Sequence, residues 1–209
     1  MKTLEQEVLK KIAKKSLFVK LVNTERNKSL VEQSISKEFL DLSAVVRVVL
    51  KMDKEGMASM TLSKRDAEIL GMTEEEIYAE ALKNTLRLFP PKLMNLEGYV
   101  EMSIGAKLLF VEDEVTTYIL TNQKEVDGAF YLMSQELVGA IAEMLEDDLY
   151  ILPSSVNEVL LVRASEVKDG VDGLKAMVRD VNETIVAEKE ILSYSVYHYD
   201  KEHGITIVA

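Results

Sequence analysis

The sequence predicts an α+β fold of mainly antiparallel strand pairs that alternate with amphipathic helices. β-branched and apolar runs come in pairs that short loops join, as in antiparallel hairpins, and two of these loops, "DKEG" and "DKEHG", contain glycine. Segments with helical periodicity and their own N-terminal capping residues stand between these pairs. Neighbouring strands joined directly, with helices between the pairs, favour an antiparallel sheet over the parallel sheet of a βαβ fold.

The first half contains a helix, a hairpin and a second helix. Residues 1–15 have a narrow apolar stripe that predicts a helix, and 16–23 are apolar enough for a short strand or turn. Residues 39–62 predict a hairpin around "DKEG", where Gly56 can supply the positive φ of the loop. Thr73 followed by Glu76 is a capping box, so a helix begins there. It ends before Pro90, because proline disfavours helical geometry at the preceding residue.

The second half repeats the same rhythm. The expected elements are a strand at 115–122, a second strand or lead-in at "GAFYLM", a helix after Ser134, strands in "DLYILP" and "NEVLLVRA", a helix from Val171 to Ile185, and a closing hairpin around "DKEHG". The helix after Ser134 is expected to bury Leu137, Ile141, Met144 and Leu145. We therefore expect an N-terminal part at 1–91, an irregular acidic connection at 92–114 and an antiparallel α+β domain at 115–209, which can pack as one unit with the first.

The charge is unevenly distributed along the chain. Residues 1–30 carry eight Lys/Arg against three Asp/Glu, a net charge of +5, and the remainder carries 17 against 33, a net charge of −16. The densest acidic region, 97–148, has twelve Asp/Glu and two lysines. Such a field repels nucleic acid and attracts basic surfaces. The alternative interpretation is a solvated surface that keeps the protein soluble.

Several classes of protein are disfavoured by the composition. The chain has no cysteine, which excludes disulfides, thiolate metal sites and cysteine nucleophiles. No apolar run has the length of a membrane span, and the N-terminus lacks the apolar core of a signal peptide. The glycines form no phosphate-binding motif, so no cofactor is expected. We therefore expect a cytoplasmic protein.

The segment "LYILPSSVNEVLLV" raises the question of a serine nucleophile. A hydrolase elbow needs Gly-x-Ser-x-Gly and a base that accepts the serine proton. Ser154 and Ser155 are flanked instead by Pro153 and Val156, and a strand follows. A structural connection, in which the serines hydrogen-bond the local backbone, is the favoured interpretation.

Two other groups of polar residues could bind a metal. "YHYDKEH" offers His198, Asp200, Glu202 and His203. On a strand His198 and Asp200 would share a face, but the turn is expected to carry His203 away. Glu112, Asp113 and Glu114 could bind a hard cation, although consecutive carboxylates on a strand alternate in direction. Solvated turns are the favoured interpretation of both, and no metal is predicted.

Several phrases together carry a resemblance to a known family. They are "KLVNTERN", "FLDLSAVVRVV", "GMTEEEIYAEALKNT", "DLYILPSSVNEVLLV", "MVRDVNET" and "ILSYSVYHYD". They resemble a bacterial domain-of-unknown-function family, widespread in anaerobic Gram-positive bacteria and often carried on mobile elements. The resemblance runs from about residue 17 to the C-terminus, with an N-terminally shortened form and Asn157 where many members carry histidine. It implies an auxiliary role, and no functional residues can be carried over from it, because none are established for the family.

The dense acidic region and the lack of a recognisable catalytic motif favour a non-enzymatic interaction protein. An acidic face can occupy a basic groove that normally holds nucleic acid, which, with the mobile-element association, suggests an inhibitor or regulator of a nucleic-acid-binding enzyme, in the manner of an anti-defence (anti-CRISPR-like) protein. The predicted partner-binding residues are Glu112, Asp113, Glu114, Glu146, Asp147 and Asp148. The alternatives are a hydrolase or metal-dependent enzyme built around Ser154 or the turn from His198 to His203, and a structural oligomer.

Overall fold

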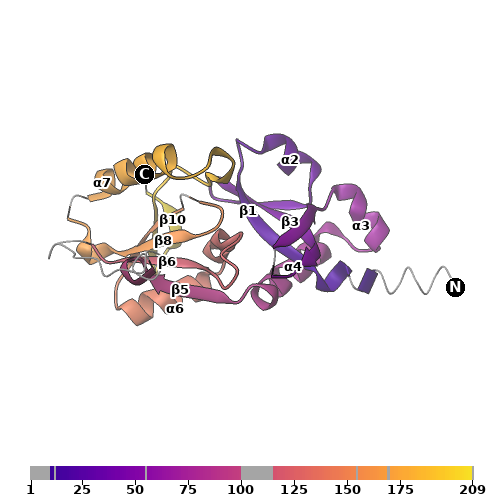
Figure 1. Ribbon diagram of the computed structural model, residues 1–209, viewed down its shortest axis with the longest axis horizontal. Coiled ribbons are helices and arrows are strands. Elements are labelled where there is room, and N and C mark those ends of the chain that lie inside the picture. The colour runs from indigo at the N-terminus through magenta and orange to yellow at the C-terminus, as the bar shows by residue number, and fades with distance from the viewer. Residues whose placement is uncertain are drawn as a thin grey trace. The chain divides into compact units, whose positions relative to one another are not determined.

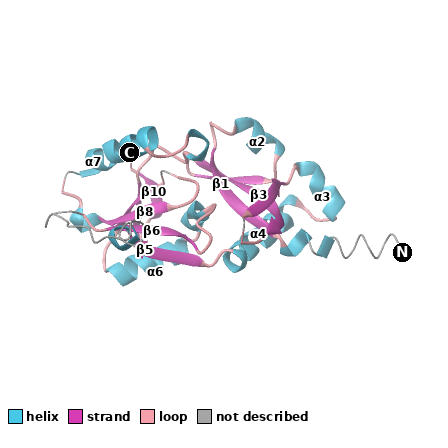
Figure 2. Ribbon diagram, viewed as in Figure 1, coloured by secondary structure: helices cyan, strands magenta, loops and turns pink. Residues whose placement is uncertain are grey.

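The computed structural model describes residues 10–11, 13–54, 56–99, 115–153, 155–168 and 170–208. The chain divides into two compact units, residues 1–90 and 91–209 (Figure 1). Each unit contains an antiparallel sheet and helices (Figure 2), so the predicted α+β class is confirmed. Residues 92–95, predicted to begin an irregular connection, lie instead in a strand of the second unit.

The first unit is built on the long central strand β3. Its elements are β1 (Leu17–Asn23), α2 (Lys28–Gln33), β2 (Ser36–Phe39), β3 (Leu42–Met52), β4 (Met57–Thr61), α3 (Lys64–Leu70) and α4 (Glu74–Leu88). β1 pairs with one side of β3, while β2 and β4 pair with the other. The predicted hairpin is confirmed, with Gly56 at φ 149° and the Asp53 N–H donating to the Gly56 carbonyl at 3.0 Å. The capping box of α4 is also confirmed, because Thr73 and Glu76 exchange hydrogen bonds.

Helix α4 covers the outer edge of β1. The Val19 N–H points away from β3 and donates to Thr85 Oγ1 at 2.9 Å. The Thr85 hydroxyl donates in turn to the Ala81 carbonyl at 2.7 Å, and the whole arrangement is buried. Phe18 packs against Phe89 with ring centroids 5.2 Å apart. A strand edge that would otherwise expose an unpaired N–H is thus closed by a helix side chain.

Replacing Thr85 by valine is expected to lower the free energy of unfolding by about 1–3 kcal/mol. Valine keeps the shape of the side chain but leaves the buried Val19 N–H without an acceptor. Urea unfolding followed by far-UV circular dichroism measures the loss. Thr184→Val is the matched control, because Thr184 makes the same bond to a carbonyl one turn back but is exposed. Its expected change is below about 0.5 kcal/mol, and equal losses in the two variants would contradict the assignment.

The second unit contains a six-stranded sheet. Its elements are β5 (Pro91–Asn95), β6 (Thr117–Asn122), η1 (Gly128–Met133), α6 (Gln135–Leu145), β7 (Leu149–Leu152), β8 (Val159–Arg163), η2 (Ala164–Glu166), α7 (Gly170–Thr184), η3 (Glu188–Glu190), β9 (Tyr197–Asp200) and β10 (Gly204–Ile207). The strand order is β10-β9-β7-β8-β6-β5, and every pair is antiparallel.

Helices α6 and α7 lie on opposite faces of this sheet (Figure 1). Leu174 and Val178 of α7 join a buried cluster with Leu152, Val162 and Val196, and Tyr150 packs against it. Neighbouring residues of a strand face opposite sides, so Leu149 and its cross-strand partner Tyr199 face away from α7. On that side α6 contacts β9 and β10, with the Tyr199 hydroxyl close to Gly139.

The strand alternative for "GAFYLM" and the expected burial of Met144 are wrong. "GAFYLM" forms the 3₁₀ helix η1 rather than a strand, because Gly128 and Ala129 donate their N–H groups to the chain at Asn157 and Val156. All five residues 128–132 are buried, so no alternation could distinguish strand from helix. In α6, Met144 is 61% exposed, whereas Val138, Ile141 and Ala142 form the buried face.

Candidate functional site: an acidic surface at the end of α6

Helix α6 carries a concentration of carboxylates at its C-terminal end. Ser134 caps the other end by accepting a hydrogen bond from the Leu137 N–H at 3.3 Å. The helix stops at Glu146, which has a left-handed conformation with φ 56°. The Glu146 and Asp147 N–H groups donate back to the last turn, at Glu143 and Ala142, so the end is closed by the helix's own carbonyls.

The predicted acidic residues differ in their surroundings. Glu146 and Asp148 are exposed. Asp147 is half-buried, and its carboxylate accepts hydrogen bonds from the Ser165 hydroxyl and, at 3.1 Å, from the Ser165 N–H. The hydrogen bond from the Ser165 hydroxyl is the main reason that the pKa of Asp147 lies below its ordinary value. Asp147 therefore fixes the chain locally, whereas Glu146 and Asp148 are open to solvent. Glu112, Asp113 and Glu114 lie outside the described residues.

Side chains that the sequence did not single out complete this acidic surface. A shallow hollow of about 410 Å³ is lined by Gly139, Ala142, Glu143, Glu146, Asp147, Asp148, Tyr199 and Lys201. Lys201 Nζ lies 3.3 Å from Glu143 Oε1 and links the β9–β10 hairpin to the helix. Glu143 could have been found from its helical spacing to Glu146 and Asp147. No local signal identifies Tyr199 or Lys201, which come from far along the chain.

The electrostatics of the α6 terminus are unfavourable for the helix itself. The C-terminal end of a helix carries partial negative charge and is stabilised by lysine or arginine. The last turn of α6 has no basic residue, and Glu143, Glu146, Asp147 and Asp148 gather there instead. Glu146 also occupies a left-handed position that glycine fills most easily. Glu143 is paired with Lys201 and the Asp147 carboxylate is stabilised by Ser165. The unfavourable interaction with the helix end, about 0.3–1 kcal/mol for each charge, therefore falls on Glu146 and Asp148.

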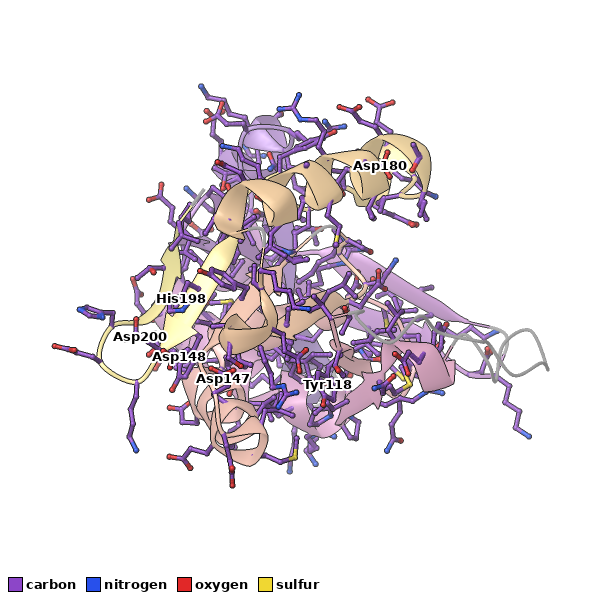
Figure 3. All side chains as sticks on the ribbon, turned by 90° about the vertical axis from the view of Figure 1, so that its left-hand side faces the viewer. Tyr118, Asp147, Asp148, Asp180, His198 and Asp200 are labelled. Atoms are coloured by element: carbon purple, nitrogen blue, oxygen red, sulfur yellow. The ribbon has the colours of Figure 1, made fainter. Side chains whose placement is uncertain are left out.

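The turn between β9 and β10 places His198 near Asp200 (Figure 3), and His203 also contacts the Asp200 carboxylate. Asp200 accepts hydrogen bonds from the N–H groups of Glu202 and His203, at 2.9 and 2.7 Å. His203 Nδ1 lies 3.0 Å from Asp200 Oδ1, and His198 Nδ1 lies 3.6 Å from Oδ2. The expectation that His203 swings away is therefore wrong, because the Asp200 side chain folds the turn back over itself. The backbone hydrogen bond from His203 is the main cause of the lowered pKa of Asp200.

This turn does not have the geometry of a metal site. His198 lies against the Tyr150 ring, with centroids 5.0 Å apart, and His203 is 63% exposed. Within the described ranges, no group of three His, Cys, Asp or Glu residues is placed to hold a metal ion. The polar residues of "YHYDKEH" instead build the hairpin turn.

Ser155 lies in the connection between β7 and β8. Ser154 lies outside the described residues. Ser155 is buried, forms an antiparallel bridge with Ile191, and accepts a hydrogen bond from the Asn157 N–H at 3.0 Å. It also hydrogen-bonds the Glu158 carboxyl. The Ser155 hydroxyl is thus used inside the fold, as the structural interpretation predicted, rather than presented to a substrate.

The comparisons with known proteins identify a family. The model of the family of unknown function DUF5688 matches residues 4–201. The chain belongs to this family. A search of curated proteins and one of solved structures both find no significant match. None of the described helices is long and apolar enough to cross a membrane.

In this DUF5688 chain, Asn157 holds the loop between β6 and η1. The Asn157 carbonyl accepts hydrogen bonds from the Thr121 hydroxyl at 2.7 Å and from the Gly128 N–H at 3.0 Å. Its side-chain oxygen accepts from the Asp127 N–H at 3.2 Å, and Asp127 has a left-handed backbone with φ 54°. Asn157 therefore has a structural role here, and this network was not visible in the sequence.

Replacing Glu158 by glutamine is expected to raise the free energy of unfolding at about pH 8 and to leave it nearly unchanged at about pH 4. Burial is the main cause that raises the pKa of Glu158 above its ordinary 4.5, and Glu190 and Glu125 add to it. When the pKa of a carboxyl is higher in the folded state than in the unfolded state, the free energy of unfolding falls as the pH rises through these two pKa values. The reason is that the carboxyl ionises less readily in the fold. Urea unfolding at both pH values tests this, with the exposed Glu183→Gln as control. A larger effect at the acidic pH would contradict it.

Proposed function

We propose that this chain is a non-enzymatic interaction module whose acidic face binds a basic surface of another protein. The observation that carries the proposal is the separation of charge between the two units. Residues 91–209 hold 22 Asp/Glu against nine Lys/Arg, a net charge of −13, whereas residues 1–90 hold 14 against 16, a net charge of +2. A field concentrated on one unit steers a partner of opposite charge to that unit.

The position of the carboxylates on α6 supports a role in binding rather than in folding. Acidic residues at a helix C-terminus, and glutamate in a left-handed position, both oppose local stability. Proteins break such local rules most often where function requires it. Glu146 and Asp148 are exposed, and Met144 beside them leaves 61% of its surface exposed. The exposed carboxylates provide charge, and the exposed methionine that precedes them in the chain provides apolar contact.

The partner that best fits this chemistry is a nucleic-acid-binding enzyme, which the module would inhibit or regulate. The groove of such an enzyme carries lysine and arginine spaced to neutralise phosphates. Carboxylates can pair with the same side chains and compete with nucleic acid for them. Inhibition by occupation of the groove requires no catalytic group on the inhibitor.

A tagged pull-down from the native host at low and moderate salt tests this function, with bound proteins identified by mass spectrometry. We expect the pull-down to recover a stoichiometric partner with a basic groove, which stays bound at low salt and dissociates as salt rises. Rebinding of the purified partner, in competition with nucleic acid, then tests occupation of the groove. A partner whose binding is insensitive to salt and to nucleic acid would contradict the proposal.

A further inference from the structure

The two outer strands of the six-stranded sheet differ in how their edges are protected. β5 carries Pro91 and Lys92, and Lys92 Nζ pairs with Glu125 Oε1 at 2.9 Å. Proline and lysine on an edge strand hinder the addition of a further strand. β10, at the other edge, has the sequence GITI, without a charged residue or proline. Among the described residues no strand pairs with the outer edge of β10.

The hydrogen-bond register shows which groups face this open edge. The Val208 N–H donates to the Val196 carbonyl at 2.9 Å, in step with the pairing of Thr206 and His198. In an antiparallel ladder, residues with backbone groups toward the partner strand alternate with residues whose groups point away. The N–H and C=O groups of Ile205 and Ile207 therefore point away from β9. They form a short row of donors and acceptors that another extended chain can pair with.

Side chains along the same edge add apolar contact. Ile207 is 42% exposed and Val208 is 44% exposed, whereas Ile205 is buried at 6%. An added strand would cover the two exposed side chains while pairing with the backbone. Backbone pairing gives affinity and exposed apolar side chains favour β-branched residues opposite them.

The charge around the edge selects a basic strand. Asp200 and Glu202 lie in the hairpin just before β10 begins. Helix α6, which contacts both β9 and β10, presents the exposed Glu136 and Glu143. The β9–β10 hairpin carries one lysine, Lys201, and its positive charge is paired with the Glu143 carboxylate. A chain with lysine or arginine at alternate positions meets opposite charge here.

We propose that the open edge of β10 takes up an extended, lysine- or arginine-rich segment of the partner protein as an added antiparallel or parallel strand. This inference rests on the proposed function and specifies the form in which the basic partner is bound. The hairpin of β9 and β10 lies at the left-hand margin of Figure 3, with Asp147 and Asp148 next to it, and all of these elements belong to one unit.

Amide hydrogen exchange of the full chain, measured by NMR, tests the strand addition with a defined probe. The probe is a short capped peptide of alternating lysine and valine, and its control is the same peptide N-methylated throughout the backbone. The unmethylated peptide is expected to slow exchange of the Ile205 and Ile207 N–H groups. The methylated peptide keeps the charge but has no N–H to donate, so we expect it to bind about tenfold more weakly.

A substitution in the chain provides an independent check. Ile207→Pro removes an N–H that points away from β9, so the hairpin can keep its own bonds. We expect this variant to bind the peptide about tenfold more weakly, and Ile207→Val to bind it within about twofold of the original chain. Circular dichroism confirms that both variants fold.

The outcomes separate this inference from the proposed function. Peptide binding that is salt-sensitive but unaffected by N-methylation and by Ile207→Pro would overturn strand addition while leaving the acidic face as the binding surface. Failure of millimolar peptide to protect Ile205 and Ile207 would also overturn strand addition. The pull-down tests the proposed function independently of β10, because it measures only whether a basic partner binds the chain in a salt-dependent way.

Discussion

Gly128→Ala is expected to lower the free energy of unfolding of the second unit by about 3 kcal/mol or more. A Cβ at this position would lie 2.3 Å from the Asn157 carbonyl oxygen and 2.9 Å from Thr121 Cα. Both are backbone atoms, and the Asn157 carbonyl already accepts the Gly128 N–H. Neither atom can move away from the new Cβ without disturbing the junction between η1, the end of β6 and the 155–158 segment.

Tyrosine fluorescence during urea unfolding measures this loss, because seven of the eight tyrosines lie in residues 91–209. Gly139→Ala is the matched control. Its Cβ would lie 2.6 Å from the Tyr199 hydroxyl, which is the end of a long side chain and can move. The helix also gains about 1 kcal/mol from the replacement of glycine by alanine. A net change below about 1 kcal/mol is expected there, and a loss as large as that of Gly128→Ala would contradict the account of the junction.

The double substitution Glu146→Lys and Asp148→Lys is expected to weaken partner binding by about 100-fold, which corresponds to about 2.7 kcal/mol. Both side chains are exposed, and reversing their charge places lysine against a basic surface. The same change is expected to leave the free energy of unfolding unchanged or to raise it by up to about 1 kcal/mol, because lysine is favoured at a helix C-terminus. Loss of binding without loss of stability would show that these acids serve the partner.

Asp180→Lys with Glu183→Lys provides the control for this experiment. These exposed residues lie on α7, across the sheet from α6, and the two double variants change the net charge equally. The control is expected to bind within about threefold of the original chain, since distant surface charges act weakly at moderate salt. Equal losses in both double variants would mean that only the net charge of the unit matters, and the α6 surface would not be the site.

Local chemistry made much of the fold predictable. The helix caps and the glycines of both hairpins act within a few residues, so the capping box at Thr73, the N-cap at Ser134, and Gly56 and Gly204 lie where the sequence predicts them. The exact buried face of α6 depended on packing against β9 and β10. In the structure the helix turns the face that carries Val138 and Ala142 toward the protein interior, and Met144 is exposed to solvent. η1 was missed because its conformation follows from backbone bonds to Asn157, about 30 residues away.

The candidate site was only partly visible in the sequence, for the same reason. Glu146, Asp147 and Asp148 stood out as a run, but Asp147 is tied to Ser165. Tyr199 and Lys201 reach the hollow through the pairing of β9 and β10, which no local pattern reveals. The folded turn at Asp200 was also missed, since a side-chain acceptor for two backbone N–H groups is seen only in three dimensions.

The most direct test of the acidic-face account is the affinity of the captured partner for the original chain and for the Glu146→Lys, Asp148→Lys variant, measured by calorimetry at low and moderate salt. We expect binding to the original chain to weaken steeply as salt rises, and the variant to bind about 100-fold more weakly at low salt. An affinity that is the same for both chains and independent of salt would contradict it.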